Sequence, residues 1–270
     1  MTRPSWAPSD VDIDTPSIAR VYDYWIGGTH NFPCDQAVAA KIASANPTLP
    51  KTFRANRAFL RRAVRELTGV GITQFLDIGS GIPATGNVHD VALESSPDAK
   101  VVYVDIDPVA VAHGRAILAD EPRAESIQGD LYKPQDIFDA PETERLLDFS
   151  QPVALILAAV LHFVPDADDP LAIIRQYTDH MVPGSFLIIS HAGVEEVPDA
   201  APSYAQSYQS SVNEVIWRSR TEVHSFFTGL DLIEPGVVPV PLWRPETAED
   251  PEGLGSAAPM FVGVARKPAN

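Results

Sequence analysis

Three aspartates stand where short apolar runs of the sequence end, and they are the side chains best suited to bind a ligand. Asp77 and Asp105 close runs rich in Val, Leu and Ile, and Asp130 follows the short run Ser126-Ile-Gln128. If these runs are parallel strands, their carboxyl ends meet at one edge of a sheet, where open α/β sheets bind ligands. We therefore expect the three aspartates to share a ligand site. The alternative for a single loop aspartate is an Asx-turn or a helix cap.

The segment Gly79-Ser-Gly81-Ile-Pro83-Ala84 follows Asp77 closely and satisfies the relaxed fingerprint of dinucleotide-binding loops, Gly-x-Gly-x-x-Ala. Asp77 argues against that interpretation, because its charge would repel the phosphates of a dinucleotide and suits an ammonium or a sulfonium. Pro83 removes one N–H group from the start of the next helix, which weakens an anion site there. Asp105 can accept both hydroxyls of a ribose, which fits S-adenosylmethionine and nicotinamide dinucleotides equally.

His162 and His191 follow two later apolar runs and are weak candidates for catalytic groups. The simpler interpretation of each is a packed histidine that orients its loop. Cys34 is the single cysteine of the sequence, which excludes multi-cysteine zinc and iron–sulfur sites. No spacing typical of metal ligands is present, so no metal site is predicted.

These residues need a framework to position them, and the sequence alternates apolar runs with helical patterns. Such alternation is typical of a buried parallel sheet with helices on both faces. We expect a Rossmann-like α/β fold with a seven-stranded, mostly parallel sheet. The expected strands span residues 74–79, 100–105, 126–128, 153–157, 184–190, 230–240 and 260–265, and the expected helices between them span residues 83–95, 108–118 and 169–181.

A helical segment precedes the expected sheet. Helices are predicted over residues 17–24, 36–45 and 52–67, the last with its apolar residues on one helical face. We expect residues 1–14 to form a flexible N-terminus, residues 15–70 a helical N-terminal lid, and residues 71–270 the Rossmann-like domain.

The chain is acidic, with 20 Lys and Arg against 36 Asp and Glu in 270 residues and a formal net charge of −16. Such a charge repels nucleic acid and anionic membranes, so neither is expected as a partner. The longest apolar stretch, residues 153–161, is far shorter than the roughly 20 residues of a membrane span. The sequence shows no signal peptide pattern. These features favour a cytoplasmic protein.

Several motifs resemble, in order, those of class I S-adenosylmethionine-dependent methyltransferases: Asp77-Ile-Gly-Ser-Gly81, Val104-Asp-Ile-Asp-Pro108, Gly129-Asp130 and Val160-Leu-His-Phe-Val-Pro165. A longer signature is similar to a bacterial S-adenosyl methyltransferase family formerly catalogued as a domain of unknown function. It spans nearly the whole chain and includes residues 16–28, Asn31-Phe32 and Asn56-Arg57-Ala-Phe-Leu60. The sequence departs from these patterns where Pro83 replaces the third glycine and where Thr29-His30 replaces a Lys-Asp pair.

The resemblance implies a role for each matched residue at an S-adenosylmethionine site. The loop of Gly79 and Gly81 would pass beside the methionine part of the cofactor, with Asp77 near its ammonium group. Asp105 would hold the ribose hydroxyls, and Ile106 would pack on the adenine.

The same resemblance places Asp130 opposite the adenine amino group, with Leu131 beside it. It also implies that the helical lid closes over the cofactor. Tyr22 and Arg57 of the lid are then candidates to bind the cofactor carboxylate.

We therefore expect a methyltransferase that acts on an unidentified small molecule by direct in-line transfer and leaves S-adenosyl-L-homocysteine. His162 could then face the transferred methyl group, and Tyr204, Tyr208 and Trp217 could line an acceptor site or belong to the core. Two other functions stay open. One is a sensor that binds S-adenosylmethionine without turnover, and the other, less favoured, is an NAD-dependent oxidoreductase.

Overall fold

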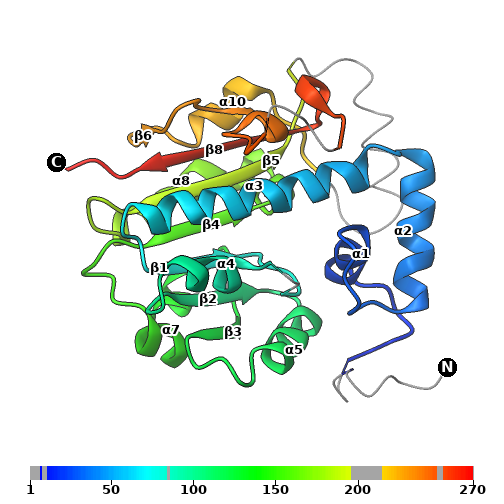
Figure 1. Ribbon diagram of the computed structural model, residues 1–270, viewed down its shortest axis with the longest axis horizontal. Coiled ribbons are helices and arrows are strands. Elements are labelled where there is room, and N and C mark those ends of the chain that lie inside the picture. The colour runs from blue at the N-terminus through cyan, green and yellow to red at the C-terminus, as the bar shows by residue number, and fades with distance from the viewer. Residues whose placement is uncertain (1–6, 8–10, 84–85, 196–214, 248–251, 270) are drawn as a thin grey trace.

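The computed structural model describes residues 7, 11–83, 86–195, 215–247 and 252–269, and these residues contain a single sheet flanked by helices (Figure 1). The strands are β1 (Gln74–Ile78), β2 (Lys100–Asp105), β3 (Ala124–Gln128), β4 (Ala154–Ala158), β5 (Phe186–Ala192), β6 (Asp231–Leu232), β7 (Val238–Pro239) and β8 (Met260–Arg266). The α-helices are α1 (Ile18–Trp25), α2 (Pro33–Ala45), α3 (Leu49–Gly69), α4 (Val88–Ser95), α5 (Pro108–Ile117), α6 (Pro134–Phe138), α7 (Pro141–Leu146), α8 (Pro170–His180) and α10 (Arg220–Ser225).

The sheet has the order β3-β2-β1-β4-β5-β8-β6, and β7 also pairs with β8. Strands β1 to β5 are parallel, and β8 runs antiparallel to β5, β6 and β7. The strand order reverses at β1, which has β2 on one side and β4 on the other. This reversal opens a crevice at the carboxyl ends of the strands, where ligands of doubly wound sheets bind.

Helices cover both faces of the sheet because successive strand residues point to opposite sides. Phe75 of β1 packs into a core that contains Phe59 of α3 and Val91 of α4. Leu76, the next residue, packs into a second core that contains Tyr177 of α8. Figure 1 shows the long helix α3 running along one face of the sheet. The expected Rossmann-like α/β architecture is confirmed.

A buried ion pair joins the first two helices, α1 and α2. Arg20 of α1 donates from Nε to Asp35 of α2 at 2.8 Å, and both side chains have no exposed surface. Asp35 also accepts from the backbone N–H groups of Phe32 and Ser17. Arg20 donates to the carbonyl oxygen of Asp12. Each charge is therefore compensated by several partners, which a buried ion pair requires.

Two expected elements differ in detail. The helix expected over residues 83–95 begins only at Val88, after Gly86 with φ of +78° and Asn87 as the N-cap. The strand expected over residues 230–240 divides into β6 and β7, so the sheet has eight strands instead of seven. A turn closed by Gly236 N–H and Ile233 O separates the two halves, and Pro235 in this turn has no N–H to donate to a neighbouring strand.

Candidate functional site

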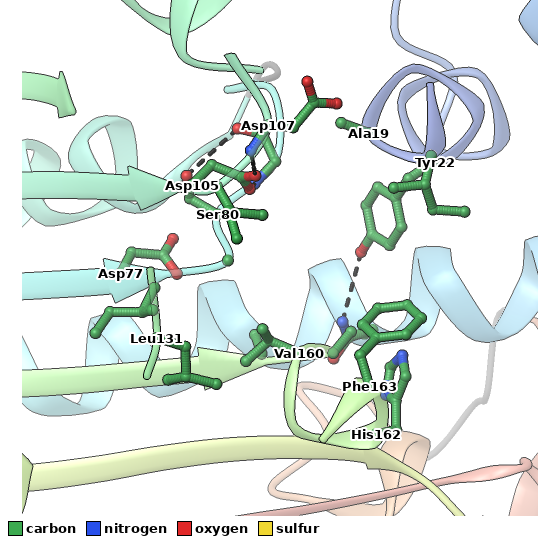
Figure 2. A pocket seen from close by; sticks show the side chains of 18 of the residues that line it. Ala19, Tyr22, Asp77, Ser80, Asp105, Asp107, Leu131, Val160, His162 and Phe163 are labelled. Carbon is green, nitrogen blue, oxygen red and sulfur yellow. Dashed lines mark hydrogen bonds between the residues drawn. The ribbon is translucent and has the colours of Figure 1, made fainter. Parts of the chain in front are cut away.

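A cavity of about 250 Å³ lies at the carboxyl edge of β1, β2 and β4, and residues of α1 and α3 complete its lining. It brings together all nine residues that the sequence predicts as a cofactor site, together with His162. Figure 2 shows Asp77, Asp105 and Asp107 on one side of this cavity and Tyr22, His162 and Phe163 on the other. The lining is therefore acidic at one end and mainly aromatic and apolar at the other.

The glycine loop after β1 turns over the end of β2. The N–H groups of Gly79 and Ser80 both donate to Val104 O, at 2.8 and 3.1 Å. Gly79 has φ of +69°, and a Cβ atom there would lie 2.5 Å from Cγ2 of Val160. Gly81 has φ of +64° with open space around it. Gly79 is therefore required by backbone conformation and by close packing, and Gly81 by conformation alone.

Asp105 closes β2 and receives one backbone hydrogen bond on each carboxylate oxygen. Gly81 N–H donates to Oδ2 at 2.8 Å, and Asp107 N–H donates to Oδ1 at 2.9 Å. Burial raises the pKa of Asp105, and these N–H groups oppose the rise. The hydrogen bonds fix the plane of a carboxylate that lines the cavity, and each oxygen keeps a lone pair for a ligand hydroxyl.

Asp77 is 3% exposed, and no described group donates a hydrogen bond to its carboxylate. Burial raises its pKa to about 7, opposed by the charge of Arg57 and reinforced by Asp105. Arg57 donates from Nη2 to Asn87 Oδ1 at 2.9 Å, while its buried Nε has no partner. A desolvated carboxylate and a guanidinium with a spare donor thus share one end of the cavity, which suits a ligand that carries both an ammonium and a carboxylate.

Asp130, Ile106 and Leu131 complete this end of the cavity. Asp130 Oδ1 accepts from Tyr132 N–H at 3.0 Å, which is the Asx-turn named above as an alternative. The turn and a ligand role are compatible, because the same carboxylate also lines the cavity. Ile106 is 64% exposed, a large value for an apolar side chain that borders a site. The Tyr177 hydroxyl of α8 donates to Leu131 O and so holds the loop after β3 against this helix.

Helices α1 and α3 are held at the site through contacts that the sequence did not reveal. Ser17 at the N-cap of α1 donates from Oγ to Asp107 Oδ2 at 2.8 Å. Asn56 of α3 donates from Nδ2 to the Tyr22 hydroxyl at 3.4 Å. The position of Asn56, directly before Arg57 in a motif of the resemblance, was the only signal available from the sequence. Both contacts join segments far apart in the chain.

The two candidate histidines occupy different places. His162 lines the cavity, and its Nδ1 accepts from Ala192 N–H at 3.5 Å. Burial and Arg218 lower its pKa to about 3. His191 is fully buried outside the lining, donates from Nδ1 to Ala192 O, and accepts from Arg218 Nη1 at Nε2. Both rings are therefore neutral, and only His162 can touch a ligand in the cavity.

None of the three aromatic residues that the sequence offered for an acceptor site is found in the lining of the cavity among the described residues. Tyr204 and Tyr208 lie outside the described residues, and Trp217 is partly buried against the core on the α3 side of the sheet. In the part of the chain that the structure describes, no group of three or more His, Cys, Asp or Glu side chains could hold a metal ion. Among the same residues, no helix is both long and apolar enough to cross a membrane.

The sequence profile of one family, described as S-adenosyl methyltransferase, matches residues 4–268. Two solved structures are similar over nearly their whole length, each with 38% sequence identity. One is a candidate methyltransferase from Thermobifida fusca YX, with a TM-score of 0.89 over 98% of this chain and 100% of that one. The other is a DUF574 family protein from Streptomyces avermitilis MA-4680, with a TM-score of 0.88 over 95% and 99%.

More distant structures share the fold. The N-methyltransferase NodS from Bradyrhizobium japonicum WM9, solved with S-adenosyl-L-homocysteine, has a TM-score of 0.50 and 13% identity over 87% of this chain and 98% of that one. No curated protein sequence matches the chain. The family match confirms the predicted resemblance and its cofactor, S-adenosylmethionine. The chain belongs to the S-adenosyl methyltransferase family.

Proposed function

We propose that the protein is an S-adenosylmethionine-dependent methyltransferase that transfers a methyl group directly to a small molecule. The observation that carries this proposal is the acidic end of the cavity, where Asp77, Asp105 and Arg57 converge. Their chemistry fits the cofactor. Arg57 brings a positive charge to the cavity, and Asp77 is a buried carboxylate with a pKa of about 7, whose ionised form a neighbouring cation would favour.

Each residue at this end would hold one part of the cofactor. Asp77 would face the ammonium group, Arg57 and Tyr22 the carboxylate, and Asp105 the two ribose hydroxyls. The adenine would lie against three neighbouring side chains, Ile106, Asp130 and Leu131. When bound, S-adenosylmethionine supplies an electrophilic methyl group on a positively charged sulfur.

The remaining residues of the cavity position an acceptor and exclude water. Alignment of two reactants in one site can contribute up to about 7–11 kcal/mol in well-oriented models, so a methyltransferase does not need an acid–base pair. His162 stays neutral because its pKa is about 3, so it is a poor proton acceptor at neutral pH. It can orient an acceptor by contact or by donating from its second ring nitrogen.

Two alternatives make different predictions. An NAD-dependent oxidoreductase would need phosphates near Asp77, a buried carboxylate whose pKa of about 7 would rise further beside another anion. A sensor would bind the cofactor through the same residues and differ only in the lack of turnover.

The first experiment is calorimetric titration of the full chain with S-adenosylmethionine, S-adenosyl-L-homocysteine and NAD. Wild type should bind the first two and not NAD. Asp105→Ala should weaken binding by about 10- to 100-fold, because it removes hydrogen bonds to a charged group. Asp120→Ala, at an exposed aspartate beyond α5, is the matched control and should leave the affinity unchanged.

Binding of NAD without binding of S-adenosylmethionine would refute the proposal. Equal affinity of wild type and Asp105→Ala would refute the assignment of the ribose site. A screen for transfer of isotope-labelled methyl to small molecules then separates the enzyme from the sensor, because only the enzyme yields a labelled product.

A further inference from the structure

The wall of the cavity that follows β4 begins with a strained backbone. Ala159 has φ of +58°, in the left-handed region that residues other than glycine rarely adopt. Ala159, His162 and Phe163 all line the cavity, the last two from the 3-10 turn Leu161–Phe163, and Figure 2 shows both of their side chains. Such strain persists only where the surrounding structure fixes the backbone. The turn therefore needs anchors from outside its own sequence.

A segment distant in the chain, residues 215–218, supplies two of these anchors through its backbone. Ile216 N–H donates to His162 O at 2.8 Å, and Arg218 N–H donates to Ala192 O, at the end of β5, at 3.4 Å. Strands β4 and β5 pair directly, so the segment contacts the end of one strand and the turn that follows its neighbour. It thereby holds the main chain of His162 against the sheet.

The side chain of Arg218 makes the closest set of contacts with the turn. It is 3% exposed, and each of its five N–H groups donates to a described acceptor. Nη1 donates to Leu161 O at 3.2 Å and Nη2 to Val164 O at 2.8 Å, so the guanidinium holds both sides of the turn. Asp166 compensates the charge, because it accepts from Nε at 3.2 Å and from Nη2 at 2.6 Å. A planar guanidinium with donors in fixed directions suits such a role.

Arg218 also reaches His162 through the second histidine. Its Nη1 donates to Nε2 of His191 at 2.7 Å, and the two histidine rings meet edge to face at 89° with centroids 5.7 Å apart. Ala192 N–H, directly after His191, donates to Nδ1 of His162 at 3.5 Å. A neutral imidazole whose Nδ1 accepts a hydrogen bond carries its proton on Nε2. The arrangement therefore selects one tautomer of His162.

We infer that Arg218 is a positioning residue of the cavity, which holds the turn after β4 and fixes the His162 ring as the Nε2–H tautomer. Arg218 lies outside the lining and acts through the turn and through His191. The inference goes beyond the proposed function, because it concerns the state of one cavity wall whichever molecule binds there. The side chain of Asp166 is 77% exposed, so Arg218→Met strands no buried carboxylate and is expected to fold.

The first test is nitrogen NMR of the histidine rings in the isotope-labelled full chain without cofactor, with His162→Gln to identify the signals of His162. Wild type should show one tautomer, with Nδ1 unprotonated and Nε2 protonated. In Arg218→Met the shifts of the two ring nitrogens should move toward each other, as they do when both tautomers are populated. Arg220→Met is the matched control and should keep the wild-type signals, because Arg220 is half exposed and pairs with Glu195.

The second test is the affinity for S-adenosyl-L-homocysteine, measured by calorimetry. Arg218→Met should bind about three- to tenfold more weakly than wild type, because its turn loses two hydrogen bonds that order it before binding. Arg220→Met should bind like wild type. If Arg218→Met does not fold, Arg218→Lys replaces it and should show the same changes in both tests, because it keeps the charge but loses the planar fork of donors.

Several results would overturn the inference. The ring signals of His162 could be the same in wild type and in the folded Arg218 variant, or Arg220→Met could change them equally. An Arg218 variant that binds S-adenosyl-L-homocysteine as tightly as wild type would also overturn it, since the turn would then not depend on Arg218. A wild type that binds no S-adenosyl-L-homocysteine would overturn the proposed function instead, and the ring signals would still decide the role of Arg218.

Discussion

The pKa of Asp77 makes cofactor binding depend on pH in a way that can be measured. Binding of an ammonium group beside Asp77 requires the ionised carboxylate, whereas the protein without cofactor ionises it only near pH 7. The affinity for S-adenosyl-L-homocysteine should therefore rise as the pH increases through about 7 and then level off. Asp77→Asn, which cannot ionise, should bind more weakly and lose this dependence.

The magnitude follows from the fraction of protein in the competent form. With a pKa of about 7, about one tenth of Asp77 is ionised one pH unit below it and about nine tenths one pH unit above it. The apparent dissociation constant should thus fall about tenfold between roughly pH 6 and roughly pH 8. At the lower pH, binding should also release close to one proton.

Isothermal titration calorimetry measures both quantities. Titrations of wild type and Asp77→Asn across this range give the dissociation constants, and buffers with different ionisation enthalpies give the number of protons released. Any ionisation of the ligand itself cancels between the two proteins. An affinity of wild type that does not change with pH would refute the reasoning, and so would an identical pH dependence in Asp77→Asn.

The same shift has a consequence for stability without cofactor. Because burial raises the folded-state pKa of Asp77 from 3.8 to about 7, the uncharged form is favoured in the folded protein. The stability associated with this group is present at low pH and is lost as the pH rises through about 7. At roughly pH 8 the loss amounts to about 4 kcal/mol at most. Asp77→Asn should therefore raise the melting temperature at that pH and change it little near pH 4.

Three further changes test the contacts of α1 and the glycine loop. Gly79→Ala should lower the melting temperature and impair cofactor binding, because its Cβ would lie 2.5 Å from the valine after β4 at a φ of +69°; unchanged stability would contradict the packing argument. Arg20→Met should lower the free energy of unfolding by about 3–5 kcal/mol in denaturant titrations, since it leaves Asp35 charged and buried, and Arg20→Met combined with Asp35→Leu should recover part of this loss. Ser17→Ala should weaken S-adenosyl-L-homocysteine binding about two- to tenfold in calorimetry, because it removes the hydrogen bond that joins the N-cap of α1 to Asp107.

Much of the fold could be predicted from the sequence, because the patterns that indicate strands and helix starts are local. Strands β1, β2 and β5 are mostly apolar runs, and Pro108 at the first turn of α5 marks a helix start. Where local signals conflicted, the predictions were less accurate. Pro83 suggested a helix start, yet α4 begins only at Val88, after Gly86 with its positive φ and Asn87 at the N-cap.

The sequence by itself determined which side chains gather at the acidic end of the cavity. The spacing of Asp77, Gly79 and Asp105 is set by strand ends and a tight turn, and parallel strands bring such ends to one edge of the sheet. Only the tertiary structure decided what these groups can do. The pKa of Asp77 and the neutrality of His162 arise from burial by segments distant in the chain. Loss of water and missing partners depend on all surrounding elements at once, and no local pattern of residues encodes them.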